Sequence, residues 1–266
     1  MIPLRDNIPS RTVPVVNYTM IAICGIVILA QLAEQQSPSS SLVERFGMIP
    51  ARLLNPDVPV MVRELVPVGG EVAVVQHEAA APSFTPWATL LTCIFLHGGW
   101  MHFLGNMWFL FIFGDNVEDR MGHLGYLLFY VFCGVSASIA HLVSSPESTI
   151  PTIGASGAIA GVMGAYFLLY PRAMVLSIVP LFVFVEMVVL PAPIFLGIWF
   201  VIQFFQGAAS ITTTQSGGVA WWAHIGGFVV GYLVAALLRA TGETRPPVGQ
   251  VRPNAERMGA YRYVRR

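Results

Sequence analysis

A serine and a histidine occupy the two segments of this sequence that are best suited to chemistry. Ser156 lies in Gly154-Ala155-Ser156-Gly157, at the start of an apolar helical run, and His224 lies early in the last apolar run. A hydroxyl beside an imidazole is the smallest unit of nucleophilic acyl transfer, because the imidazole takes the hydroxyl proton and later returns it to the leaving amine. Packing is the alternative explanation, since glycine and serine also serve close helix contacts in lipid.

The elements that must position these residues are membrane-spanning helices. The chain is 55% hydrophobic and 11% charged, whereas a soluble domain usually carries about 25% charged residues. Its net charge of zero gives no indication of a nucleic-acid partner. Because about 20 apolar residues cross a bilayer core, we expect an all-α polytopic bundle with spans near residues 14–33, 98–114, 124–143, 155–171, 191–208 and 219–239.

These spans place Ser156 and His224 at one depth. Pro171-Arg172 marks the inner end of the fourth span, and Arg239 marks the inner end of the sixth. Each candidate residue precedes its boundary by fifteen residues, which corresponds to roughly 22 Å of helix. The hydroxyl and the imidazole are therefore expected to meet below the outer edge of the bilayer core.

The second span carries further polar groups in His97, His102 and Asn106. His102 and Asn106 are four residues apart and share one helical face. His102 lies close to the depth of Ser156, where the first N–H groups of a helix also offer hydrogen bonds to a developing oxyanion. A metal site is the rival reading, but a set of histidines with Asn and no matched carboxylate fits zinc poorly, so no metal is predicted.

Arginine sets the expected orientation, since basic loops remain cytoplasmic. With both termini inside, the inner segments hold Arg5, Arg11, Arg120, Arg172 and the seven arginines from Arg239 to Arg266. The outer segments hold Arg45, Arg52 and Arg63. The expected domains are a cytoplasmic tail at 1–13, a membrane domain at 14–240 with a long outer loop at 34–86 and an interfacial helix at 87–97, and a disordered Arg-rich tail at 241–266.

The apolar run at 173–190 allows two interpretations. It could be a seventh span, which would reverse the side of everything that follows. It contains Pro180 and Glu186, and its β-branched residues alternate with others. Because a buried glutamate without a partner is costly in lipid, we interpret the run as an interfacial hairpin.

Three motifs together resemble the rhomboid intramembrane proteases. They are His-x4-His-x3-Asn at 97–106, Gly-x-Ser-Gly at 154–157 and Ala-His-x-x-Gly at 223–227, and they fall in this order on spans two, four and six. The resemblance covers roughly residues 87–240. The charged segment 114–122 also resembles the turn that follows span two in this family. Its charged residues would fix that turn at the inner surface.

The resemblance implies a Ser–His dyad, with Ser156 as the nucleophile and His224 as the general base, and no third acidic member. It implies that His102, Asn106 and the Ser156 amide form the oxyanion hole. His97, Gly154 and Gly157 would line the site. No cofactor is implied. Substrates would be membrane proteins whose transmembrane helix enters past residues 191–206, under a cap at 209–218, and the chain would sit in a bacterial inner membrane.

Two departures from the family pattern stand out. Many members have an aromatic ring four residues after the serine, stacked on the histidine, and here that position is Ala160. Trp221 or Trp222 would have to orient His224 instead. Some members carry a Trp-Arg pair in the first outer loop, but here Trp87 is followed by Ala88.

Two other functions remain open from the sequence. A catalytically silent rhomboid-like protein that binds membrane clients would lack the serine or the histidine, and both are present. A proton-coupled transporter using His102 and His224 would be expected to carry acids within its spans, and only Glu186 qualifies.

Overall fold

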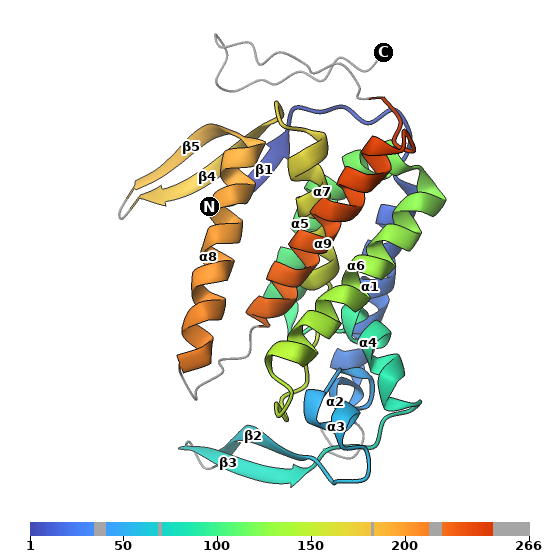
Figure 1. Cartoon of the computed structure of the whole chain (residues 1–266). Coiled ribbons are helices and arrows are strands. Elements are labelled where there is room, and N and C mark those ends of the chain that lie inside the picture. Colours follow the sequence, from blue (N-terminus) through green and yellow to red (C-terminus); the bar gives the residue numbers. More distant parts are fainter. Residues whose placement is uncertain (35–40, 69–70, 182–183, 213–219, 247–266) are drawn as a thin grey trace.

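Helices occupy all six predicted spans, and the predicted helical membrane bundle is confirmed. The computed structural model describes residues 1–34, 41–68, 71–181, 184–212 and 220–246. Each of these helices begins within two residues of the predicted start of its span, and α8 stands at one edge of the bundle (Figure 1). The helices at the predicted spans are α1 (Val15–Ala33), α5 (Trp100–Met121), α6 (His123–Ser144), α7 (Ser156–Leu169), α8 (Ala192–Thr212) and α9 (Trp221–Ala240).

These six helices differ in whether they are long enough to cross a membrane. Among the described residues, α1, α6, α8 and α9 are long and apolar enough to cross a membrane, and α5 qualifies together with the short helical run Pro86–Phe95, which meets it at 77°. That run contains η2 (Pro86–Ala88), α4 (Thr89–Thr92) and η3 (Cys93–Phe95), where a helix was predicted. Helix α7 has 14 residues, about 21 Å of rise, and every residue from Gly157 to Tyr166 is buried.

Glycines let α7 touch α9 backbone to backbone. A side-chain carbon added at Gly227 would lie 2.1 Å from the carbonyl oxygen of Gly157, and one added at Gly231 would lie 2.0 Å from that of Gly161. A carbon added at Gly164 would lie 2.1 Å from the carbonyl oxygen of Phe228. Close approach through small residues is the usual way helices associate in lipid, and here it fixes the spacing of the two helices that carry Ser156 and His224.

The segment predicted to be a turn after span two is helical instead. Helix α5 continues through Asp115 and Asp119 to Met121, and the chain reverses at Gly122, whose φ of +74° suits glycine. The acids of this last stretch are buried against the N-terminal segment rather than exposed in a turn. Because these acids are buried in contact with other residues, the helix continues past residue 114, where the predicted span ends.

The run at 173–190 forms an antiparallel hairpin, as predicted. Strand β4 (Met174–Leu181) pairs with β5 (Phe184–Pro191), with Met174 opposite Pro191. Strand β1 (Ile2–Asp6) joins the other edge of β4, with Asp6 opposite Val175. Strand β1 lies within residues 1–13, where the sequence predicts a tail and no strand.

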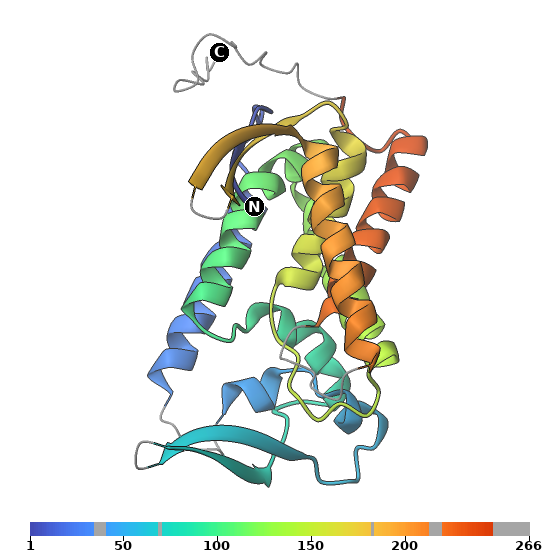
Figure 2. The same ribbon diagram turned by 90° about the vertical axis from the view of Figure 1, so that its left-hand side faces the viewer.

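The loop predicted at 34–86 contains helices α2 (Leu42–Phe46) and α3 (Pro50–Leu54) and a hairpin of β2 (Met61–Val68) with β3 (Glu71–Glu78). The two sheets lie at opposite ends of the bundle (Figure 2). One end of the bundle therefore carries the sheet of β1, β4 and β5, and the other end carries the β2–β3 hairpin.

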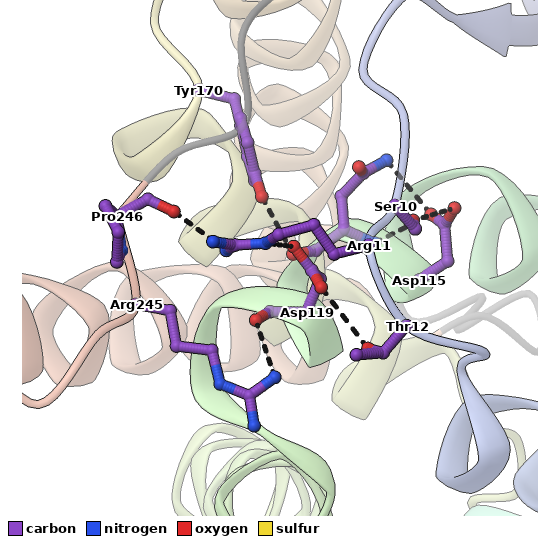
Figure 3. A network of polar contacts seen from close by, with 9 residues as sticks. Ser10, Arg11, Thr12, Asp115, Asp119, Tyr170, Arg245 and Pro246 are labelled. Carbon is purple, nitrogen blue, oxygen red and sulfur yellow. Dashed lines mark hydrogen bonds and ion pairs between the residues drawn. The ribbon is translucent and has the colours of Figure 1, made fainter. Parts of the chain in front are cut away.

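Buried acids at the end of α5 fasten both termini to the bundle (Figure 3). The Asp115 carboxylate accepts a hydrogen bond from Ser10, and Asp119 pairs with Arg11 at 2.9 Å. Arg11 in turn donates to the carbonyl of Pro246 at 2.8 Å. Residues 7–14 and 241–246 therefore lie at one end of the molecule. The tail predicted to be disordered lies mostly outside the described residues, as does the predicted cap at 209–218 in its larger part.

Candidate active site

A cavity of about 810 Å³ lies among α5, α7, α8, α9 and the α6–α7 loop. Ser156 and His224 both line it, and so do His102 and Asn106. The structure thus gathers into one cavity four residues that the sequence reading placed at one site. The loop from Ser145 to Ile153 forms much of its wall toward the end of the bundle that carries β2 and β3.

Ser156 and His224 are in hydrogen-bond contact. Ser156 is the first residue of α7 and His224 the fourth of α9, and 2.7 Å separates Oγ of Ser156 from Nε2 of His224. The Gly157–Gly227 contact holds the two helices together beside this pair. A hydroxyl at this distance can pass its proton to an unprotonated Nε2.

The other ring nitrogen of His224 contacts α8. Nδ1 lies 2.6 Å from Oε1 of Gln203, whose side chain is 7% exposed. An amide oxygen only accepts hydrogen bonds, so Nδ1 carries the proton in this contact. Nε2 then presents its lone pair to Ser156, which is the tautomer that a general base requires.

The tautomer of His102 is set by a backbone amide. Gly98 donates its N–H to Nδ1 of His102 at 3.2 Å, which leaves Nε2 as the protonated nitrogen. A side-chain carbon placed on Gly154 would lie 2.9 Å from this Nε2 and 3.5 Å from Oγ of Ser156. The two groups therefore flank one small space, kept open because residue 154 is a glycine.

Asn106 adds an unused donor to the cavity wall. Its side chain is 9% exposed, and its buried Nδ2 has no hydrogen-bond partner in the described part of the chain. A buried donor without a partner is costly. Such a group is what an oxyanion-binding site holds ready for its ligand.

His97, Gly154 and Gly157, predicted to line the site, are not among the residues that line the cavity. His97 is 1% exposed and packs edge-on against the ring of His102, with 5.3 Å between centroids. Gly154 has a φ of +127° and gives His102 room, and Gly157 serves the contact with α9. His97 and Gly157 are buried and Gly154 is half-buried, so these three residues shape the site through their neighbours rather than line its cavity.

Two indole rings flank His224 in place of the ring missing at Ala160. Trp221 stands edge-on to the imidazole at 6.1 Å, and Trp199 of α8 lies 5.9 Å away at 36°. Trp221 is one of the two residues that the sequence predicts to orient His224, whereas Trp199 is not. The sequence could not name Trp199, because the contact depends on how α8 packs against α9.

Gln203 and His141 are two further polar cavity residues that the sequence did not assign to the site. His141 of α6 lines the cavity, and its buried Nδ1 has no partner among the described residues. A polar side chain inside an apolar span was the available signal for each. Among the described residues, no group of three or more His, Cys, Asp or Glu is arranged to hold a metal ion.

Comparisons with known proteins agree on one family. The Rhomboid domain model matches residues 85–241. The chain is 30% identical over 164 residues to Rhomboid-like protein 11, chloroplastic, of Arabidopsis thaliana, covering 59% of this chain and 54% of that protein. It is 35% identical over 154 residues to Rhomboid protease GluP of Bacillus subtilis (strain 168), covering 57% of this chain and 26% of that protein.

A shorter match reaches the Putative rhomboid protease YdcA of the same bacterium, 38% identical over 80 residues, or 30% of this chain and 40% of that protein. The chain spans about half or less of the length of these relatives. Since the domain match covers more than half of the chain and apolar helices make up its bundle, this is an integral membrane protein that belongs to the rhomboid family.

Proposed function

We propose that this chain is an intramembrane serine endopeptidase that cleaves transmembrane segments of other membrane proteins near the outer face. The observation that carries the proposal is the 2.7 Å contact between Oγ of Ser156 and Nε2 of His224 in a cavity of about 810 Å³. The name of one relative, a rhomboid protease of Bacillus subtilis, supports the same reaction class. No cofactor takes part.

The reaction begins at Ser156. His224 takes the hydroxyl proton on Nε2 while Oγ bonds to the scissile carbonyl carbon. The carbonyl oxygen becomes an oxyanion, and the donors proposed to stabilise it are Nε2–H of His102, Nδ2 of Asn106 and the amide N–H of Ser156. The first N–H groups of α7 have no acceptor within the helix, and the positive end of its dipole favours negative charge there.

Collapse of this intermediate breaks the peptide C–N bond, and the amine leaves with the proton from Nε2 of His224. Water then enters, gives a proton to Nε2 and attacks the acyl carbon, and the acid is released as the proton returns to Oγ. The hydrocarbon core excludes water, so the reaction needs a polar cavity. The cavity supports this need, because Glu147, Ser148 and Thr149 of the α6–α7 loop are part of its lining.

We also propose that α1 and α5 to α9 all cross the membrane, with both termini in the cytoplasm. The distribution of arginine supports this orientation, and the Arg11–Pro246 contact supports a common side for the two ends. The native cysteines Cys24, Cys93 and Cys133 are buried. Single cysteines at Asn55 and Glu243, which are exposed, should therefore react with an impermeant maleimide from opposite sides. The bacterial inner membrane stays a prediction from sequence.

Cleavage of a generic transmembrane substrate by purified protein in detergent tests the activity. Ser156→Ala should abolish cleavage and leave the melting temperature unchanged. Ser144→Ala is the matched control, since Ser144 is exposed and its hydroxyl donates to the carbonyl of His141. Full activity in Ser156→Ala would refute the proposal. Substrate binding without cleavage by the unaltered protein would instead favour the silent binding factor.

A further inference from the structure

One face of α8 is turned toward His224. Trp199, Gln203 and Gly207 are spaced four residues apart, so they share a face of the helix. A side-chain carbon on Gly207 would lie 3.1 Å from Cδ1 of Ile225 and 3.4 Å from Cβ of Trp221. Helix α8 is therefore held close to the start of α9, one turn beyond Gln203.

Gln203 is a buried polar residue between two exposed apolar neighbours on α8. Its neighbours Ile202 and Phe204 are 46% exposed each and face outward, whereas Gln203 is 7% exposed. Burying an amide without a hydrogen bond is costly. The 2.6 Å contact from Nδ1 of His224 to Oε1 of Gln203 satisfies this group. Gln206, three residues on, is exposed.

Gln203 controls the two properties of His224 that acyl transfer needs. As an acceptor at Nδ1 it favours the tautomer that keeps the lone pair on Nε2 free for the Ser156 proton. With Nε2 bonded to Ser156 and Nδ1 bonded to Gln203, the ring is held at both nitrogens. Rotation of the imidazole would break both bonds.

We propose that Gln203 is a positioning residue for the reaction and takes, as a neutral amide on α8, the place of the acidic third member that a Ser–His–Asp triad has. This inference rests on the proposed function. Unlike a carboxylate, the amide adds no charge to the apolar surroundings. It orients His224 and selects its tautomer, and it does not touch the reacting atoms.

The test compares four variants in detergent. Gln203→Met keeps the length of the side chain but removes the acceptor, Gln203→Asn keeps an amide one carbon too short to reach, and Gln203→Glu keeps an acceptor oxygen at full reach. Gln206→Met makes the same change as the first variant on the exposed side of α8. Labelling of Ser156 by a small fluorophosphonate reports nucleophile activation independently of substrate entry.

We expect Gln203→Met and Gln203→Asn to lower both the labelling rate and kcat by about 10- to 100-fold, the range of one buried hydrogen bond, with KM little changed. Gln203→Glu should recover at least half of the lost activity on a logarithmic scale. Gln206→Met should be labelled at Ser156 at the rate of the unaltered protein. If Gln203→Met fails to fold, Gln203→Asn and Gln203→Glu still give the comparison.

Equal labelling rates in Gln203→Asn and in the unaltered protein would overturn the inference. So would equal losses in Gln203→Glu and Gln203→Asn, because that result would mean that packing rather than the acceptor matters. These outcomes are distinct from failure of the proposed function, in which the unaltered protein is neither labelled at Ser156 nor active on any transmembrane substrate.

Discussion

Gly154 stands where any side chain would collide with His102. A carbon added at Gly154 would lie 2.8 Å from Cε1 and 2.9 Å from Nε2 of that ring. The glycine also has a φ of +127°, which L side chains rarely adopt. Two separate constraints, one from the backbone and one from a candidate oxyanion donor, therefore meet at the residue two positions before Ser156.

Gly154→Ala should lose activity by more than its loss of stability explains. The strained φ should cost about 1–3 kcal/mol of unfolding free energy, and displacement of His102 should lower kcat further. Gly99→Ala is the matched control, because Gly99 has a φ of +132° but open space around the added carbon. Cleavage rates and melting temperatures of both variants decide the matter. Equal activity in the two would show that the contact with His102 is unimportant.

His102→Ala and Asn106→Ala should each lower kcat by about 10²–10³, the usual effect of removing one oxyanion donor. The expected change in KM is small, because the donors act on charge that develops in the transition state. Asn55→Ala, at an exposed position of the loop at 34–86, is the control. An unchanged kcat would assign these two residues to packing alone.

The contact between α7 and α9 should tolerate no side chain. Gly231→Ala places a carbon 2.0 Å from the carbonyl oxygen of Gly161, so the helices must separate. We expect a loss of about 1–3 kcal/mol, as for overpacked cores, and lower activity, since α9 also carries His224. Gly125→Ala, whose added carbon would meet nothing nearer than Cβ of Met121 at 3.6 Å, should be close to neutral in thermal unfolding. A melting temperature of Gly231→Ala equal to that of Gly125→Ala would contradict the packing.

Asp6 should make the protein less stable as pH rises. Burial, with the nearby Asp115 charge, raises the pKa of Asp6 from 3.8 to about 8. The folded state thus keeps a proton that the unfolded chain loses near pH 3.8. Between these two values the unfolded state binds fewer protons, so the stability from protonated Asp6 is complete below pH 3.8 and is lost as pH rises through about 8.

Asp6→Asn should remove this part of the pH dependence, because an amide is uncharged throughout. Thermal unfolding in detergent at several pH values between 4 and 9 measures this pH dependence of stability. Asp57→Asn, at an exposed position of the loop at 34–86, is the control. A parallel pH dependence in Asp6→Asn and the unaltered protein would show that Asp6 does not hold its proton.

The sequence by itself determined the six helical segments and the common height of Ser156 and His224 along their helices. Both follow from local rules, since apolar runs become helices in lipid, where each backbone group must be satisfied within its own segment. A fixed rise per residue then converts chain distance to height. The hairpin at 173–190 was also readable, because alternation of side chains is a local pattern.

Only the tertiary structure decided which side chains surround the pair. Helix α5 runs on to Met121 because its last acids bond the N-terminal segment, and β1 forms because β4 offers it an edge. His97 lies behind His102, and Gln203 reaches His224, through the way neighbouring helices rotate and pack. Apolar periodicity sets where a helix lies along the chain. Its rotation and its neighbours depend on contacts between residues far apart in sequence, which no local pattern records.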